Sequence, residues 1–441
     1  MKQLSTLLAA AAIAASMTAV PATVVAQDAE QYVPIFSYRT GPYAPNGIPV
    51  ADGTVDYLKL VNAKGGINGV KFKIEECEFA YDTAKGIECY ERLKGQNGGA
   101  AIVQPISTGV TTALLKKAPE DEIAVIMGGY GPPEAADGEV FKWIFPVIPT
   151  YFVAADVMVQ AIGERVGGMD QLKGKKIDYV YMDAPFGHQF MPVFEAHAKQ
   201  YGFTLNKLPV TAPGLDQKST WLQVRRDKPD YVLYVGYGVM NPTALKEAQS
   251  VGYPRDQIYG FWWAGSESDV KGVEEAAKGY NAVALQASAN RDAKVVKDIL
   301  DTLYANGQGT AQDKSTVGDV LYIRGVITGM MTAEAVRIAQ EEFGEGKPIT
   351  GAQAQWALEH MDLTEERLEE LGFTGILLPH KMTCKQHMGS YAARMSVWDG
   401  KEWKINGDWY EGNHELIDSL IKSTADKYAA DNKIERRDCD S

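Results

Sequence analysis

Short apolar runs alternate with segments of helical periodicity along the first part of the chain. Between residues 32 and 129 this pattern predicts strands within 32–47, 70–82, 99–106 and 123–129, with helices over 47–69, 83–96 and 109–121. Such alternation is typical of a doubly wound α/β unit with a parallel sheet.

The same pattern starts again at residue 151, which predicts a second α/β unit. Helices are expected over 151–168, 188–202 and 241–252, and strands over 175–182, 230–236 and 256–263. The proline-spaced stretch FPVIPTY, residues 145–151, predicts a crossing between the two units. Residues 291–370 look mostly helical, and residues 394–410 alternate around Asp399-Gly400, which indicates a hairpin.

Length and charge narrow the function classes. A chain of 441 residues suits two domains rather than one core. The net charge is −13, so nucleic acid and anionic lipid surfaces are disfavoured as partners.

The first residues have the three-part layout of a secretory signal peptide. Met1-Lys2 is followed by an alanine-rich apolar run from Leu4 to Val20 and then by small residues before a polar stretch. We expect residues 1–26 to be removed after Ala26. A membrane anchor is the alternative, and the alanine-rich run and cleavage-like site disfavour it.

The cysteines suggest disulfides in an exported chain. Cys77, Cys89, Cys384 and Cys439 allow three pairings. A short Cys77–Cys89 clip would leave Cys384 with Cys439, which would tie down the tail, and four free thiols are the disfavoured alternative. The spacings do not resemble a zinc site.

Glycine, hydroxyl and aromatic residues recur where the predicted strands end, and ligands of open α/β sheets bind at those ends. One such stretch is Ser107-Thr108-Gly109, before a helix. Taken alone, it is most simply an N-terminal helix cap. Similar residues at the ends of predicted strands in both units favour a ligand-binding role as well.

Enzyme motifs are missing from these exits. The sequence has no GxSxG around Ser107, no Walker loop, no strand-to-helix GxGxxG and no HExxH. We therefore expect no catalytic residue, no cofactor and no metal site.

An ordered set of stretches carries a resemblance to a known family. These are TGPYAPNG with NAKGGING, residues 40–69; QPISTGVTTALL, residues 104–115; MDAPFGHQF, residues 182–190; and LPHKMTCKQHMG with the following hairpin, residues 378–403. Together they resemble the periplasmic solute-binding proteins of ABC transporters, branched-chain amino-acid type, over essentially the whole mature chain.

The resemblance implies two doubly wound parallel-sheet lobes joined by a three-segment hinge, with the ligand cleft between them. The first lobe would comprise residues 27–149 and 290–380, and the second 150–289 and 381–441 with the C-terminal tail. It also implies a monomer in the periplasm that docks on an inner-membrane ABC permease.

The resemblance also implies a set of ligand-binding residues. From the first lobe these are Ser107 and Thr108, which would hold a carboxylate, and Gly129, Tyr130 and Gly131. From the second lobe they are Phe186, Tyr237, Trp262, Trp263 and Ser266, with one of the two tryptophans expected to pack in the core.

The sequence departs from the family at one informative place. Gly265 or Ser266 stands where amino-acid binders have the acid that holds the α-amine, and Glu267 would fit only with a shift. This departure favours an aromatic or short aliphatic acid over a branched-chain amino acid. A ligand sensor for a membrane kinase or chemoreceptor is the alternative function, and a secreted hydrolase using Ser107 is a weaker one.

Overall fold

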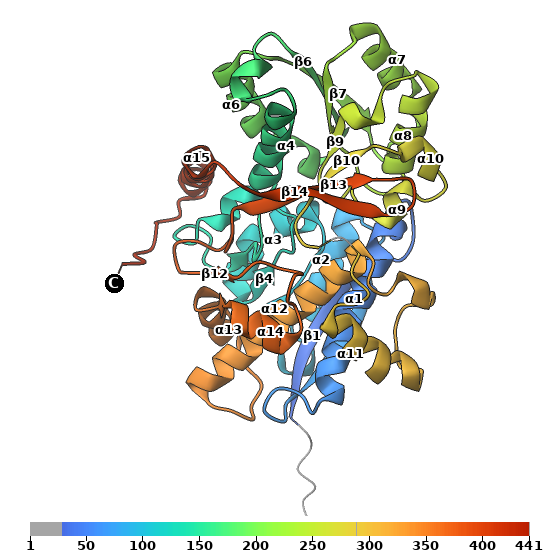
Figure 1. The fold of residues 1–441 in the computed structure, drawn as a ribbon. Coiled ribbons are helices and arrows are strands. Elements are labelled where there is room, and N and C mark those ends of the chain that lie inside the picture. The colour runs from blue at the N-terminus through green and yellow to red at the C-terminus, as the bar shows by residue number, and fades with distance from the viewer. Residues whose placement is uncertain (1–28, 288, 441) are drawn as a thin grey trace, which may run out of the picture.

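The computed structural model describes residues 29–287 and 289–440. The expected signal peptide lies outside the described residues. Two α/β lobes are stacked in Figure 1, the first mainly blue, cyan and orange and the second mainly green and yellow. Each lobe is built around its own mainly parallel sheet, as the sequence pattern predicted.

The strands of the first lobe follow the order β2-β1-β3-β4-β5. β1 and β2 run parallel over their whole length, and a bridge between Ile35 and Gln104 joins β1 to the segment of β3. The strands are β1 (Glu30–Ser37), β2 (Lys71–Glu78), β3 (Ile102–Val103), β4 (Ala124–Ile126) and β5 (Ile144–Phe145). The helices are α1 (Ala44–Ala63), α2 (Thr83–Leu93), α3 (Thr108–Asp121), α11 (Lys294–Thr302), α12 (Val320–Phe343), α13 (Gly351–Glu359) and α14 (Glu365–Leu371).

The second lobe repeats this order and adds the predicted hairpin at one edge. Its sheet runs β14-β13-β10-β9-β8-β6-β7, with β13 and β14 antiparallel. The strands are β6 (Lys176–Asp183), β7 (Thr204–Thr211), β8 (Tyr231–Val235), β9 (Ile258–Gly260), β10 (Asn281–Ala284), β13 (Ala392–Trp398) and β14 (Trp403–Glu411). The helices are α4 (Tyr151–Arg165), α5 (Pro185–His188), α6 (Met191–Tyr201), α7 (Lys218–Asp227), α8 (Met240–Ser250), α9 (Glu267–Val270) and α10 (Glu274–Ala277).

The sequence pattern did not predict β7 or α7. β7 lies at the edge of its sheet, and only two of its eight residues are buried. An edge strand with polar side chains has a weak hydrophobic pattern, so period-two alternation does not reveal it.

The chain passes between the lobes three times. It crosses after β5, after β10, and between β12 (His380–Lys381), which pairs with β11 (Asp362–Leu363), and β13. The residue numbers at which the lobes were expected to divide stay a prediction.

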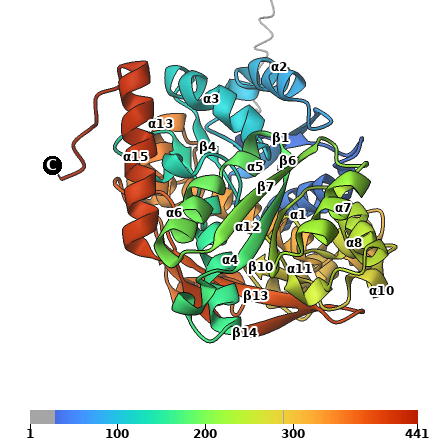
Figure 2. The ribbon, with the colours of Figure 1, turned by 90° about the horizontal axis from the view of Figure 1, so that it is seen from above.

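The C-terminal segment contacts both lobes. Helix α15 (His414–Asn432) packs on α6 of the second lobe and on residues 133–136 of the first, and runs along one side of the molecule in Figure 2. Beyond it, Arg436 binds Asp137 of the first lobe at 2.7 Å. Thus the hairpin of segment 381–441 belongs to the second sheet, whereas the tail returns to the first lobe.

Two disulfides are present, Cys77–Cys89 and Cys384–Cys439. The first joins β2 to α2, and the second holds the tail against the crossing that follows β12. The favoured pairing of the cysteines is therefore confirmed.

Helices α1 and α12 pack closely because glycine lies at their contact. A Cβ atom on Gly53 would lie 2.0 Å from the Tyr322 carbonyl oxygen, and one on Gly325 would lie 2.1 Å from that of Val50. Glycine at both positions lets the two backbones approach. This packing positions Arg324, the residue next to Gly325, at the junction of the lobes.

Candidate functional site

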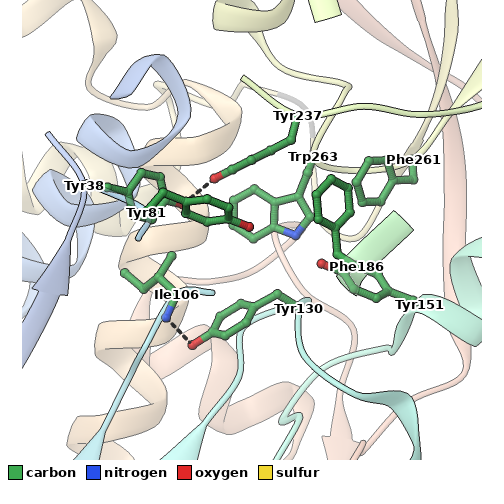
Figure 3. Close-up of a pocket in the computed structure, with 9 residues that line it drawn as sticks. All are labelled: Tyr38, Tyr81, Ile106, Tyr130, Tyr151, Phe186, Tyr237, Phe261 and Trp263. Carbon is green, nitrogen blue, oxygen red and sulfur yellow. Dashed lines mark hydrogen bonds between the residues drawn. The ribbon is translucent and has the colours of Figure 1, made fainter. Parts of the chain in front are cut away.

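A cavity lies between the lobes and is lined almost entirely by aromatic rings (Figure 3). It is narrow, with room for little more than one water-sized group. Its lining residues are Tyr38, Tyr81, Ile106, Tyr130, Tyr151, Phe186, Tyr237, Phe261 and Trp263. No acidic or basic side chain is among them.

The first lobe contributes residues that follow the carboxyl ends of its strands. Tyr38 follows β1, Tyr81 follows β2, Ile106 precedes α3 and Tyr130 follows β4. Tyr81 and Ile106 have φ values of 61° and 49°, in the left-handed region that bulky residues rarely adopt. Such strain is found at ligand sites, where the surrounding structure imposes it.

The second lobe faces them with the corresponding ends of its own strands. Phe186 follows β6, Tyr237 follows β8, and Phe261 and Trp263 follow β9. The Trp263 ring lies edge-on to Tyr237, with ring centroids 5.7 Å apart. In Figure 3 the Tyr237 hydroxyl points to Tyr38, and these two hydroxyls are hydrogen bonded across the cleft.

Ser107 and Thr108 lie at the amino end of α3, beside the cavity. Ser107 is the N-cap, and its Oγ accepts from the Val110 amide at 3.3 Å. Thr108 Oγ1 accepts from the Gly131 amide at 3.1 Å, which joins two strand exits of the first lobe. The capping role inferred from the sequence is confirmed, and neither residue is among those that line the closed cavity.

The tyrosines of the cavity are neutral at physiological pH. Burial raises the pKa of Tyr81 and Tyr151, whereas contacts from Ser107 to Tyr81 and from Thr108 to Tyr151 act in the opposite direction. Burial likewise raises the pKa of Tyr38. Neutral phenols can donate as well as accept, so the cavity offers hydroxyl groups inside an apolar wall.

Trp262 and Trp263 have different surroundings although they are adjacent. The indole Nε1 of each donates to the Gly129 carbonyl oxygen at 2.7 Å, so both bridge the lobes. Trp263 lines the cavity, while Trp262 is fully buried and stacks on Tyr151 with ring centroids 6.0 Å apart. Trp262 is thus the tryptophan that packs in the core.

The expected position of an amine-binding acid holds no free carboxylate. Ser266 is the N-cap of α9 and forms a capping box with Asp269. The carboxylate of Asp269 accepts from Asn46, Asn241 and Ser266, while Glu267 accepts from the Val320 amide at 3.1 Å. Neither acid is among the cavity-lining residues.

Direct contacts hold the lobes together in this structure. The Val239 amide donates to the Pro42 carbonyl at 3.1 Å, and Asn46 Nδ2 donates to Asp269 at 3.0 Å. With the two indole bonds to Gly129, these contacts define a closed arrangement of the cleft.

Arg324 of α12 adds a buried positive charge next to the cavity. Its side chain is 1% exposed, and its guanidinium stacks on the Trp263 ring 4.6 Å from the centroid. Nη1 donates to the Trp262 carbonyl at 3.0 Å and Nη2 to Gln286 at 3.1 Å. Burial lowers the pKa of Arg324 to about 10, so the group stays charged at neutral pH.

The structure thus brings four of the ten sequence-predicted residues into the cavity wall: Tyr130, Phe186, Tyr237 and Trp263. Four more residues lie directly behind that wall: Ser107, Thr108, Gly129 and Gly131. Trp262 and Ser266 are buried within the second lobe. Sequence reasoning missed five wall residues, Tyr38, Tyr81, Ile106, Tyr151 and Phe261, and the charge of Arg324. Tyr38 and Tyr81 had a usable signal, because each lies where a predicted strand ends.

The described residues give little support for a metal site or for Ser107 as a nucleophile. Within the described residues, no three or more His, Cys, Asp or Glu side chains are grouped as a metal site. Ser107 has no histidine beside it as a base, since the six histidines bind other partners, among them Asp183, Asp156, Trp356, Leu378, Ile144 and Glu411. None of the described helices has the length and hydropathy to cross a bilayer.

Comparison with known proteins agrees with this geometry. The family model described as periplasmic binding protein matches residues 30–402. The chain belongs to this family. It comprises the substrate-binding components of ABC transporters, and its name places its members in the periplasm.

Three known proteins illustrate what the chain is similar to. A crystal structure from the Pseudomonas fluorescens group, described as an ABC transporter permease, is 37% identical, with 94% of this chain and 100% of that chain covered and a TM-score of 0.86. The Leu/Ile/Val-binding protein BraC3 of Rhizobium johnstonii is 21% identical over 262 residues, 59% of this chain and 69% of its own. A solute-binding protein of R. palustris, solved in complex with benzoate, is 17% identical, with 86% and 96% covered and a TM-score of 0.65.

Proposed function

We propose that this chain is the periplasmic receptor of an ABC importer and traps a small carboxylic acid that has no ammonium group. The acid is aromatic or short and aliphatic. The observation that carries this proposal is the absence of any carboxylate among the residues that line the cavity. An α-ammonium group enclosed there would lose its hydration and gain no charged partner, which costs several kcal/mol.

The polar groups that are present suit an anion. Arg324 places a positive charge against the Trp263 ring, and its charge lowers the pKa of Tyr38 and Tyr151, which both line the cavity. The amino end of α3 approaches the same space and also favours negative charge. Phenol hydroxyls can donate hydrogen bonds to the carboxylate while the rings enclose its apolar part.

Closure of the two lobes around the ligand would be the mechanism of binding. Ligand that contacts both lobes stabilises the closed form over the open one, because only the closed form makes both sets of contacts. The closed structure leaves room for little more than one water-sized group between the rings, less than typical ligand sites offer. The walls therefore have to move apart to admit even a small acid.

Matched ligand pairs test the proposal directly. Leucine is compared with 4-methylpentanoate, and phenylalanine with 3-phenylpropanoate, in a thermal-shift assay followed by calorimetry. Benzoate and short aliphatic acids are screened alongside. We expect the acid without the amine to raise the melting temperature by mass action and its amino-acid partner to have no effect. A shift with leucine-like amino acids alone would contradict the proposal.

A further inference from the structure

A second small cavity, with room for about one water-sized group, lies where α12 of the first lobe meets the sheet of the second. The residues that matter in its wall are Val320 and Arg324 of α12, Gln286 after β10, Ser396 of β13 and Trp403 of β14. It is distinct from the aromatic cavity, and the two share no lining residue. Arg324 lines the second cavity and stacks on Trp263 of the first, so it links the two.

The positive charge of Arg324 has no counter-charge at contact distance. Among the described residues Arg324 forms no ion pair, and its bonds go to the Trp262 carbonyl and the Gln286 amide, both neutral. Asp269 is the carboxylate whose charge it feels, but that carboxylate is already bound by Asn46, Asn241 and Ser266. A buried charge left in this state is costly unless another ion compensates it.

The unused polar atoms around this cavity are donors. Arg324 Nε and Trp403 Nε1 are buried N–H groups without a hydrogen-bond partner. The other polar side chains are already bound: Ser396 Oγ donates to the Ala282 carbonyl at 3.0 Å, and Gln286 Nε2 donates to the Val320 carbonyl at 2.9 Å. A cation would find no carboxylate there, and a neutral molecule would leave the charge uncompensated.

We propose that this cavity binds a small monovalent anion of the size of chloride, held by Arg324 and the Trp403 indole N–H. The anion supplies the missing counter-charge and accepts a hydrogen bond from each of the two free N–H groups. While it is bound, the amino end of α3 and the phenol hydroxyls are the groups that favour a carboxylate in the aromatic cavity. Because α12 and the second sheet both form the wall, the bound anion stabilises the junction of the lobes without entering the aromatic cavity.

Bromide replaces chloride in the first experiment, because its anomalous scattering identifies it. Crystals of the full mature chain grown in sodium bromide are expected to show an anomalous peak in this cavity, next to Arg324 and Trp403. An empty or water-filled cavity in that experiment would overturn the proposal.

Solution measurements test the donors. At equal ionic strength and without ligand, we expect sodium chloride to raise the melting temperature relative to sodium gluconate, whose anion is too large. Arg324→Met and Trp403→Phe are expected to abolish the difference. If the arginine variant fails to fold, Trp403→Phe still removes the indole N–H while leaving the guanidinium in place.

Arg394→Met is the matched control. Arg394 also stacks on an indole, that of Trp409 at 4.5 Å, and its Nε also has no partner, but it is not among the residues that line this cavity. The control should keep the full chloride effect. A chloride effect that survives in Trp403→Phe and Arg324→Met, or that disappears in Arg394→Met, would count against the site.

Discussion

The hydroxyl groups of Tyr38 and Tyr237 are hydrogen bonded to each other across the cleft, although 199 positions separate the two residues in the chain. Tyr38 belongs to the first lobe and Tyr237 to the second, and both rings line the aromatic cavity. A bond of this kind can form only when the lobes close. It therefore links the polar chemistry of the cavity to the conformational change.

Removing this bond is expected to weaken ligand binding. Tyr38→Phe and Tyr237→Phe should each lower affinity about 5-fold, since a net hydrogen bond contributes about 1 kcal/mol. The double variant should be little weaker than either single one, because both changes break the same bond. Calorimetric titration measures all three. Tyr253→Phe, which loses a bond to the Pro229 carbonyl away from the cleft, should bind normally.

The amino end of α3 is expected to serve both stability and binding. Ser107→Ala should cost about 1 kcal/mol of unfolding free energy, as for other N-cap substitutions, and should also reduce affinity. Thr364→Ala removes the equivalent cap of α14 and should cost similar stability without changing affinity. Denaturant unfolding and titration separate the two effects. If Ser107→Ala and Thr108→Ala both bind normally, the stretch is only a helix cap.

Trp262 and Trp263 should respond differently to the same substitution. Phenylalanine at either position loses one hydrogen bond to the Gly129 carbonyl, so the two variants lose the same polar contact. Trp263→Phe also loses the stacking of Arg324 and reshapes the cavity wall, and we expect roughly a tenfold loss of affinity, or about 1.4 kcal/mol. Trp262→Phe should mainly lower the melting temperature, because it removes packing volume from a fully buried site. Equal effects of the two variants on affinity would contradict this division.

Ligand affinity is expected to decrease as pH rises. Burial and, next in size, the Asp319 carboxylate raise the pKa of Glu267 from 4.5 to about 7 in the closed structure. Asp269 also disfavours its charge, while Arg291 is paired with Asp319. Since closure favours the protonated form, this contribution to closure is complete below pH 4.5 and is lost as pH rises through about 7.

Titrations between pH 5 and pH 8 measure this dependence. Glu267→Gln should remove most of it, and Glu274→Gln, which changes an exposed acid on the neighbouring helix α10, should leave it intact. An affinity that stays constant with pH in the unmodified protein would exclude Glu267 as the titrating group.

The α/β architecture could be predicted because it depends on local patterns. Strands such as β8, buried at all five positions, have continuous apolar runs, and α2, which buries Gly86, Cys89, Tyr90 and Leu93, has a clear helical repeat. The Asp399-Gly400 turn likewise identified the hairpin of β13 and β14. The edge strand β7 was missed because mainly exposed side chains weaken the pattern.

The site itself was only partly predictable. Strand exits indicated Tyr130, Phe186, Tyr237 and Trp263, because topology places such residues at one edge of a sheet. The sequence could not show that Trp262 packs inward while its neighbour faces the cavity. Nor could it show that the wall is completed by Tyr38, Tyr81, Ile106, Tyr151 and Phe261, because their positions depend on how the two lobes meet.

The local pattern of the sequence was enough to establish two α/β units, an ordered set of family stretches and the lack of an acid at Gly265 and Ser266. Only the tertiary structure decided which side chains face each other, because contacts such as Tyr38 with Tyr237 join segments far apart in the chain. The same holds for Arg324, an ordinary polar residue within a helical repeat until the packing of α12 against the second lobe buries its charge. Burial sets the energetic consequence of a charge, and burial is a property of the assembled fold.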